Sequence, residues 1–182
     1  IVSKKPQTTR NRITGIHTTG EDQYVFLDTP GLHKPRTKLG DYMVKTATET
    51  LGGVDLAILA VEAREAVGDI EEGLLAKIRS AGIPAILVIN KTDTVRPENI
   101  AKTIKAYADA FDFAAVVPMS AKNGHGVDTL LSECEKFLYE SEWFFPSDIV
   151  TDQPERQIAA EIIREKLLRL LEEEIPHGTA VA

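Results

Sequence analysis

Two uninterrupted apolar runs constrain the fold of this chain more than any other feature. They span residues 56–61 and 85–89 and consist of leucine, isoleucine, valine and alanine. Short continuous runs of this kind are typical of strands that are buried on both faces of a sheet. Helical periodicity fills the intervening segments, and this alternation is typical of a βαβ protein with a mostly parallel sheet. We therefore predict an α/β fold.

Three further strands are predicted. Residues 13–19 alternate between apolar and polar side chains, residues 24–28 form a second run, and the turn-rich segment Gly20-Glu21-Asp22 joins them. Because this connection is too short for a crossover, the two strands form an antiparallel hairpin, which we place at one edge of the sheet. Residues 114–119 form a weaker apolar run and a fifth strand.

Two amphipathic helices are predicted in the C-terminal half. One covers residues 127–138, and its apolar stripe includes Cys134, which we interpret as a small core residue rather than a nucleophile. The other covers residues 155–171, has no core of its own within this chain and therefore needs a partner. Its apolar face consists of Ala159, Ile162, Ile163, Leu167 and Leu170. Its basic residues either contact RNA or form a solvated face with neighbouring glutamates, and we favour the second reading for Arg156, Arg164, Lys166 and Arg169.

The composition sets limits on the function. A length of 182 residues with 43% hydrophobic residues suffices for one α/β domain and a short appendage. The net charge of −7 argues against a nucleic-acid surface over the whole chain, although a local basic patch is compatible with it. The single cysteine excludes a disulfide framework, and no apolar run is long enough to cross a membrane. We expect a cytosolic protein.

The first polar motif, Asp28-Thr29-Pro30-Gly31, directly follows a predicted strand. A carboxylate at the carboxyl end of a strand lies where ligands bind in open α/β sheets, and Asp28 can hold a magnesium ion through water. Gly31 allows the backbone to approach a terminal phosphate closely enough to donate its N–H. The alternative is a simple turn that Asp28 caps.

The second motif, Asn90-Lys91-Thr92-Asp93, follows the apolar run that ends at Ile89. Asp93 can accept hydrogen bonds from the N1–H and the exocyclic amine of guanine, whereas adenine would leave the carboxylate unpaired. Asn90 can brace the loop and reach the other edge of the base. The stem of Lys91 can lie over the ring while its ammonium stays in water. The alternative is a polar loop without a ligand.

The third motif, Ser120-Ala121-Lys122, follows the fifth predicted strand. The N–H of Ala121 can donate to the guanine carbonyl, and Lys122 can cover the base from its other side. Alone this tripeptide means little. Three such motifs in this order, each after its own strand, are far more specific and resemble the G3, G4 and G5 motifs of Ras-like GTPases.

A finer resemblance is to the Era-type bacterial GTPases, and it covers essentially the whole chain. The segment Lys5-Pro6-Gln7-Thr8-Thr9-Arg10 resembles their switch I, and residues 28–33 resemble their switch II. Residues 161–166 (EIIREK) resemble the entry into their C-terminal KH domain, an RNA-binding module. The resemblance implies a Ras-like P-loop NTPase fold with an antiparallel edge hairpin, followed by an incomplete α+β KH-type domain.

The resemblance also implies ligands and roles. The cofactors are GTP or GDP and Mg²⁺; Thr9 is the first choice and Thr8 the alternative for binding the metal with Asp28, and Thr9 and Gly31 serve the catalytic step. The implied nucleotide-binding residues are Asp28, Thr29, Pro30, Gly31, Leu32, Asn90, Lys91, Thr92, Asp93, Ser120, Ala121 and Lys122.

The implied function is a GTP-hydrolysing switch that binds the 3′ region of small-subunit ribosomal RNA and assists assembly of the small ribosomal subunit. A monomer is implied, in the cytoplasm and also peripherally at the inner face of the cell membrane. Two alternatives stay open: a scaffold that is deficient in nucleotide binding, and another translation-related GTPase of the same class.

Two departures from the family pattern matter. Leu32 stands where Ras-like GTPases commonly carry the glutamine that orients water, so we expect slow intrinsic hydrolysis. No G-x-x-x-x-G-K-[ST] segment occurs in the 182 residues. We therefore expect an incomplete part of a longer protein, inactive by itself, with a GTPase domain at 1–138 that lacks its first strand and P-loop, a linker at 139–153 and the beginning of a KH-type domain at 154–182.

Overall fold

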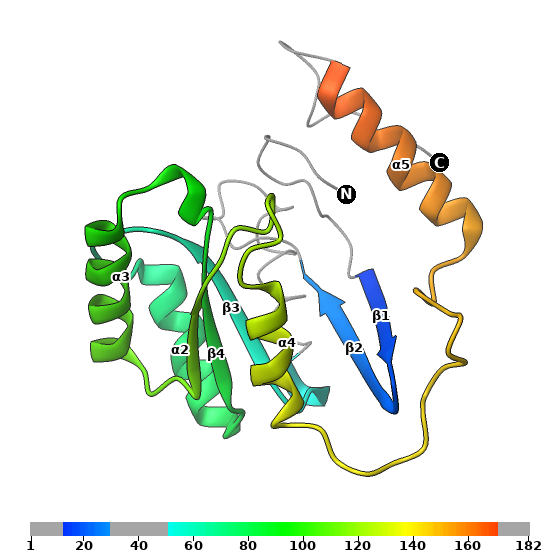
Figure 1. Cartoon of the computed structure of the whole chain (residues 1–182), viewed down its shortest axis with the longest axis horizontal. Helices are drawn as coiled ribbons and strands as arrows, with labels where there is room; N and C mark the ends of the chain where they lie inside the picture. The colour runs from blue at the N-terminus through cyan, green and yellow to red at the C-terminus, as the bar shows by residue number, and fades with distance from the viewer. Residues whose placement is uncertain (1–12, 30–50, 171–182) are drawn as a thin grey trace. The chain divides into compact units, whose positions relative to one another are not determined.

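The computed structural model describes residues 13–29 and 51–170, with the side chains of 51 and 168–170 left aside. The chain divides into two compact units (Figure 1). One unit contains residues 51–140, and the other contains residues 1–50 and 141–182. This division differs from the sequence-based boundaries at 138 and 153, which stay predictions.

A three-stranded parallel sheet forms the centre of the unit of residues 51–140. Its order is β3-β4-β5, and its strands are β3 (Ala57–Glu62), β4 (Ala85–Asn90) and β5 (Ala115–Pro118). The predicted α/β class with parallel strands is confirmed. Two short 3₁₀ helices, η1 (Leu51–Gly53) and η2 (Thr92–Thr94), accompany the sheet.

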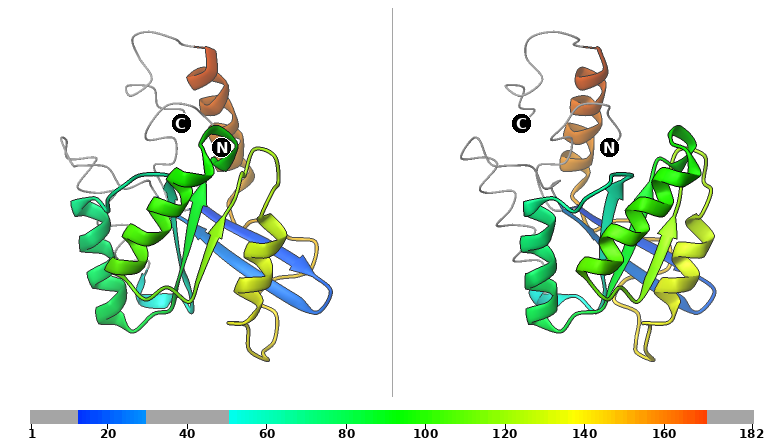
Figure 2. Two further views of the ribbon diagram at one scale, coloured as in Figure 1. Left: turned by 60° about the vertical axis from the view of Figure 1, so that its left-hand side comes forward. Right: turned by 90° about the vertical axis from the view of Figure 1, so that its left-hand side faces the viewer.

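Three helices pack on this sheet: α2 (Asp69–Ala81), α3 (Pro97–Ala110) and α4 (Val127–Glu135). Figure 2 shows α2 and α3 on one side of the sheet and α4 on the other. Leu75 and Ile78 of α2 and Tyr107 of α3 are almost completely buried in one core with Leu87 and Ile89 of β4. This apolar burial is the main stabilising contribution within the unit.

The two apolar runs differ in burial. All five residues from Ala85 to Ile89 in the central strand are buried, so the prediction of burial on both faces is confirmed for β4. It is wrong for β3, in which Ile58 is 36% exposed while Leu59 and Val61 are buried. Within the described residues, β3 is an outer strand of its sheet, and the core that it shares with α2 and α3 covers one of its faces.

Helix α4 ends at Glu135, earlier than the predicted residue 138. Cys134 lies inside it and is buried, as the helical stripe predicted. Burial raises the pKa of the Cys134 thiol, and the charge of Glu133 adds to this effect. Cys134 is therefore a core residue and a poor nucleophile. Among the described residues, no helix is both long and apolar enough to span a lipid bilayer.

The predicted hairpin is confirmed in the other unit. Strand β1 (Ile13–Thr19) pairs antiparallel with β2 (Asp22–Asp28), with Ile13 opposite Asp28 and Thr19 opposite Asp22. Gly20 supplies the positive φ of 59° that the tight turn requires. Within the described residues the hairpin forms a two-stranded sheet of its own.

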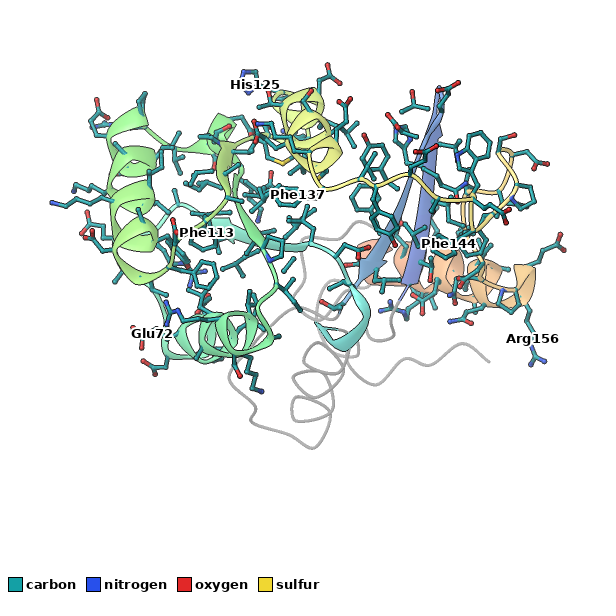
Figure 3. The ribbon with its side chains drawn as sticks, turned by 90° about the horizontal axis from the view of Figure 1, so that it is seen from below. Glu72, Phe113, His125, Phe137, Phe144 and Arg156 are labelled. Atoms are coloured by element: carbon teal, nitrogen blue, oxygen red, sulfur yellow. The ribbon has the colours of Figure 1, made fainter. Side chains whose placement is uncertain are left out.

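Residues 143–151 form a strap along this hairpin. The indole N–H of Trp143 donates to the carbonyl of Glu21 at 2.9 Å. The side-chain amide of Gln23 bonds both backbone groups of Phe145, at 2.8 Å and 3.0 Å. The sequence predicted a linker that aromatic side chains anchor; Trp143 does so, but Phe144 is 74% exposed (Figure 3). Polar contacts hold most of the strap.

The strap also forms hydrogen bonds with strand β1 of the hairpin. The N–H of Ile16 donates to the carbonyl of Val150 at 2.8 Å, and the hydroxyl of Thr151 donates to the carbonyl of Thr14 at 2.6 Å. These bonds satisfy backbone groups at an edge that would otherwise be open to pairing with another chain.

Helix α5 (Glu155–Leu170) follows the strap, as predicted. Ile162 and Ile163 of its predicted apolar face are about half exposed. Arg156 points outward at the start of the helix (Figure 3), but Arg164 is only 4% exposed and pairs with Glu161. The predicted pairing with glutamate is confirmed for Arg164, whereas the prediction that Arg164 is solvated is wrong, because its side chain is almost completely buried.

Candidate functional site

The second and third polar motifs meet at one edge of the parallel sheet. Asn90 is the last residue of β4, and Ser120 follows β5 by two positions. The strands are parallel neighbours, so their carboxyl ends lie side by side, which is where open α/β sheets bind ligands. The structure therefore brings together two motifs that lie thirty residues apart in the sequence.

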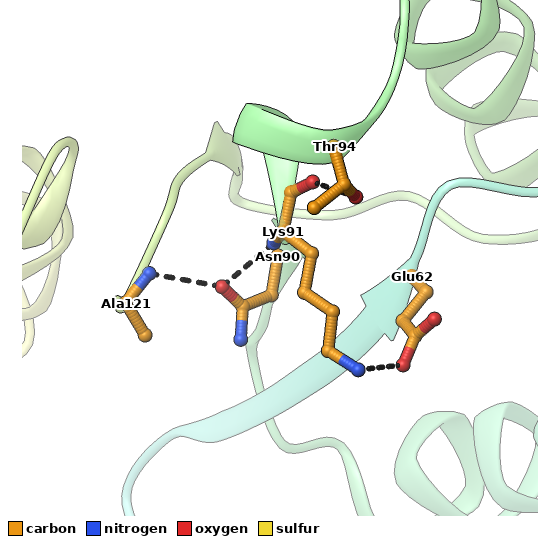
Figure 4. Close-up of polar contacts among 5 residues, drawn as sticks. All are labelled: Glu62, Asn90, Lys91, Thr94 and Ala121. Carbon is orange, nitrogen blue, oxygen red and sulfur yellow. Dashed lines mark hydrogen bonds and ion pairs between the residues drawn. The ribbon is translucent and has the colours of Figure 1, made fainter. Parts of the chain in front are cut away.

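Asn90 braces the two loops against each other (Figure 4). Its Oδ1 accepts hydrogen bonds from the N–H of Lys91 at 2.8 Å and from the N–H of Ala121 at 3.0 Å. The N–H of Thr92 adds a second link by donating to the carbonyl of Met119 at 3.1 Å. The N–H of Ala121, which the sequence analysis assigned to a guanine carbonyl, thus donates to Asn90 in this structure.

Asp93 is oriented by a buried serine. The hydroxyl of Ser120 donates to Oδ1 of Asp93 at 2.7 Å, and Ser120 is almost completely buried while Asp93 is exposed. Within the described residues, no group donates to the other carboxylate oxygen. Asp93 therefore presents a fixed acceptor to the solvent side of the loop, suited to a pair of N–H donors. The sequence predicted Ser120 as a site residue but did not indicate this role.

The loop that carries Ser120 depends on Gly126. This residue has a φ of 82°, and a Cβ atom there would lie 2.8 Å from the carbonyl oxygen of Pro118. The N–H of Ser120 donates to the carbonyl of His125 at 2.9 Å, which closes the loop. His125 and Lys122 are both exposed. The sequence did not predict a role for Gly126, because the requirement for glycine at this position depends on the close approach of Pro118 in β5.

Lys91 has the one positive φ among the described non-glycine residues, at 62°. Its ammonium forms an ion pair with Glu62, the last residue of β3 (Figure 4). Glu62 was not among the residues predicted for the site. The signal was present, since Glu62 ends one strand as Asn90 ends its neighbour, and the two are register partners.

Asp28 and Thr29 of the first motif belong to the other unit. Asp28 is exposed at the open end of the hairpin, opposite Ile13. The remaining predicted residues of this part, Thr8, Thr9, Pro30, Gly31 and Leu32, lie outside the described residues. No group of three potential metal-ligating side chains occurs within residues 13–29 and 51–170.

Residues 4–140 match the family described as the elongation factor Tu GTP binding domain. Among solved structures, the chain is 36% identical to Era in complex with MgGDPNP and nucleotides 1506–1542 of 16S ribosomal RNA, with a TM-score of 0.87. It is also 36% identical to Aquifex aeolicus Era Y63A bound to GDP·AlF4⁻, with a TM-score of 0.86. Both matches cover 97% of this chain and 60% of the Era chain, so the chain spans about three fifths of each.

A more distant structure, the elongation factor SelB of Methanococcus maripaludis with GPPNHP, is 21% identical. The match covers 75% of this chain and 31% of the SelB chain, with a TM-score of 0.59. At this level of identity it supports the fold alone. The resemblance to Era and the Ras-like fold that it implied are thereby confirmed. The chain belongs to the family of elongation factor Tu-type GTP-binding domains, in which its structure is similar to that of Era.

Proposed function

We propose that the chain is the part of an Era-like GTPase switch that recognises the guanine base. The observation that carries this proposal is the orientation of the Asp93 carboxylate. The hydroxyl of Ser120 donates a hydrogen bond of 2.7 Å to its Oδ1, and Asn90 stabilises the neighbouring loop. A fixed carboxylate of this kind matches the N1–H and the exocyclic amine of guanine. Adenine offers no such donor pair and would leave the carboxylate desolvated without a partner.

The proposed ligands are GTP or GDP with Mg²⁺. Their support is the similarity to Era, whose structures contain MgGDPNP and GDP·AlF4⁻. In this proposal Asp28 and Thr9 hold the metal, and Gly31 offers its N–H to the terminal phosphate. The metal and the phosphates supply most of the charge at the site, so a cluster of protein carboxylates is not needed. Hydrolysis is proposed to be slow because Leu32 cannot orient water.

Isothermal titration of the full-length protein with GDP, ADP and XDP tests the guanine proposal. We expect GDP to bind at least about 100-fold more tightly than ADP, since a site built for polar donors strongly rejects a ligand that lacks them. Equal affinity for GDP and ADP would contradict the proposal. Hydrolysis is measured separately as phosphate release from GTP at saturating Mg²⁺.

We further propose that the protein binds the 3′ region of small-subunit ribosomal RNA and assists subunit assembly, as a cytoplasmic monomer that also associates with the inner face of the membrane. The RNA part is supported by the similarity to Era, which has been crystallised with a 16S rRNA segment. Helix α5 adds to this, because its half-exposed Ile162 and Ile163 suit packing in a larger C-terminal domain.

Fluorescence anisotropy with an oligonucleotide of the 3′ end of that RNA tests the RNA proposal in the full-length protein. The logarithm of the association constant should fall linearly with the logarithm of the salt concentration, since phosphate contacts release counterions. A scrambled oligonucleotide of equal length is the control. Equal affinity for both oligonucleotides would contradict specific recognition.

A further inference from the structure

The backbone of Lys91 is held from both directions. Its N–H donates to Oδ1 of Asn90 at 2.8 Å. Its carbonyl accepts from the N–H of Thr94 at 3.0 Å and from the hydroxyl of Thr94 at 2.8 Å. These bonds stabilise a left-handed conformation that a lysine rarely adopts. The direction in which the Lys91 side chain leaves the loop is therefore fixed.

The far end of the same side chain is held by Glu62 (Figure 4). The carboxylate of Glu62 forms an ion pair with the ammonium of Lys91. The position of Glu62 follows from the sheet, because it ends β3 and is the register partner of Asn90 at the end of β4. Parallel pairing thus places a carboxylate beside the residue that follows Asn90.

We infer that Glu62 is a positioning residue of the guanine site and acts through Lys91. The inference rests on the proposed function. With its backbone and its ammonium both held, the four-carbon stem of Lys91 is an ordered apolar support for a purine ring. Without Glu62, the stem would sample more rotamers and would lose this freedom again when the ring binds. Glu62 therefore pre-orders a binding surface that it does not itself form.

The expected effect is small in size but specific. The side chains of Lys91 and Glu62 are 57% and 63% exposed, so the solvent screens their attraction. Exposed pairs of this kind correspond to a change in affinity of about two- to fivefold. The effect should shrink as salt is raised, because salt screens charges that are exposed to water.

A matched control exists in the next loop. Lys102 and Glu65 form another exposed ion pair at 2.6 Å, with side chains 57% and 72% exposed. This pair links the loop after β3 to α3, and within the described residues neither side chain forms a hydrogen bond or ion pair with the two nucleotide motifs. Glu65→Gln therefore makes the same chemical change as Glu62→Gln without touching Lys91.

A double-mutant cycle on the full-length protein tests the inference. Dissociation constants for GDP are measured for the wild type, Glu62→Gln, Lys91→Met and the double variant, at low and at high salt. We expect Glu62→Gln to weaken GDP binding by about two- to fivefold in the wild-type background and to have no effect beside Lys91→Met. Glu65→Gln should leave the affinity unchanged.

Two outcomes would overturn the role of Glu62. One is that the Glu62→Gln and Glu65→Gln proteins bind GDP with the same affinity. The other is the same loss in both Lys91 backgrounds, which would mean that Glu62 acts independently of Lys91. The wild-type preference for GDP over ADP is recorded in the same titrations. If that preference is present while the cycle shows no coupling, the inference fails and the proposed function stands; if the preference is absent, the proposed function itself fails.

Discussion

Replacing Asp93 with asparagine should convert a guanine site into a xanthine site. The carboxylate of Asp93 can accept two N–H donors, whereas an amide offers one acceptor and one donor group. The donor group faces the exocyclic amine of guanine unfavourably but suits the 2-oxo group of xanthine. We expect GDP affinity to fall by about 100-fold or more, because charge-assisted hydrogen bonds are lost and donors are left unpaired. XDP affinity should rise.

The loop itself should survive this substitution. The amide oxygen of an asparagine can still accept the hydrogen bond from Ser120, and the braces from Asn90 do not involve position 93. Asp109→Asn is the control, since it makes the same chemical change on the exposed side of α3. Titrations with GDP and XDP measure the switch. An Asp93→Asn protein that binds GDP as the wild type does would exclude Asp93 from base recognition.

The strand pattern and the polar motifs were predictable because both are local properties of the sequence. The run 85–89 became the buried central strand, and Asn90 and Asp93 follow it directly. The burial of β3 was not predictable in the same way. Its composition is as apolar as that of β4, but its exposure depends on which neighbours and helices cover it.

The contacts between loops could not be predicted from the sequence for a related reason. The pairing of Glu62 with Lys91 requires the register of β3 against β4, and the bond from Ser120 to Asp93 requires the register of β4 against β5. Local patterns do not contain these registers. The sequence signal that points toward this contact is an acidic residue at the end of one strand, Glu62, and a basic residue directly after its parallel neighbour, Lys91.

The strap of residues 143–151 shows a second limit of prediction from the sequence. Its aromatic content predicted anchoring by packing, yet Gln23 bonds the backbone of Phe145 while the Phe144 side chain stays in water. A backbone group can be bonded whatever side chain it carries, so an irregular segment that is held this way leaves little trace in its own composition. The residue that reveals it, Gln23, lies more than a hundred residues away.

Replacing Gly126 with alanine should lower the free energy of unfolding more than any other substitution considered for this protein. Two costs add at this position. A non-glycine residue with a φ of 82° is strained, at about 1–2 kcal/mol. The new Cβ would also lie 2.8 Å from the carbonyl oxygen of Pro118 and 2.9 Å from Cβ of Met119, and overpacking of this kind costs about 1–3 kcal/mol. We expect a total loss in the free energy of unfolding of about 2–5 kcal/mol.

Gly124→Ala separates the two costs. Gly124 has a similar φ of 75°, but nothing lies within 4 Å of the position of its Cβ. It should therefore lose only the backbone share, about 1–2 kcal/mol, in urea unfolding of the same protein. Because the clash in Gly126→Ala pushes on Met119, which precedes Ser120, the GDP affinity should also fall in this variant and be largely kept in Gly124→Ala. Equal unfolding free energies for the two variants would show that the close approach to Pro118 does not constrain the loop.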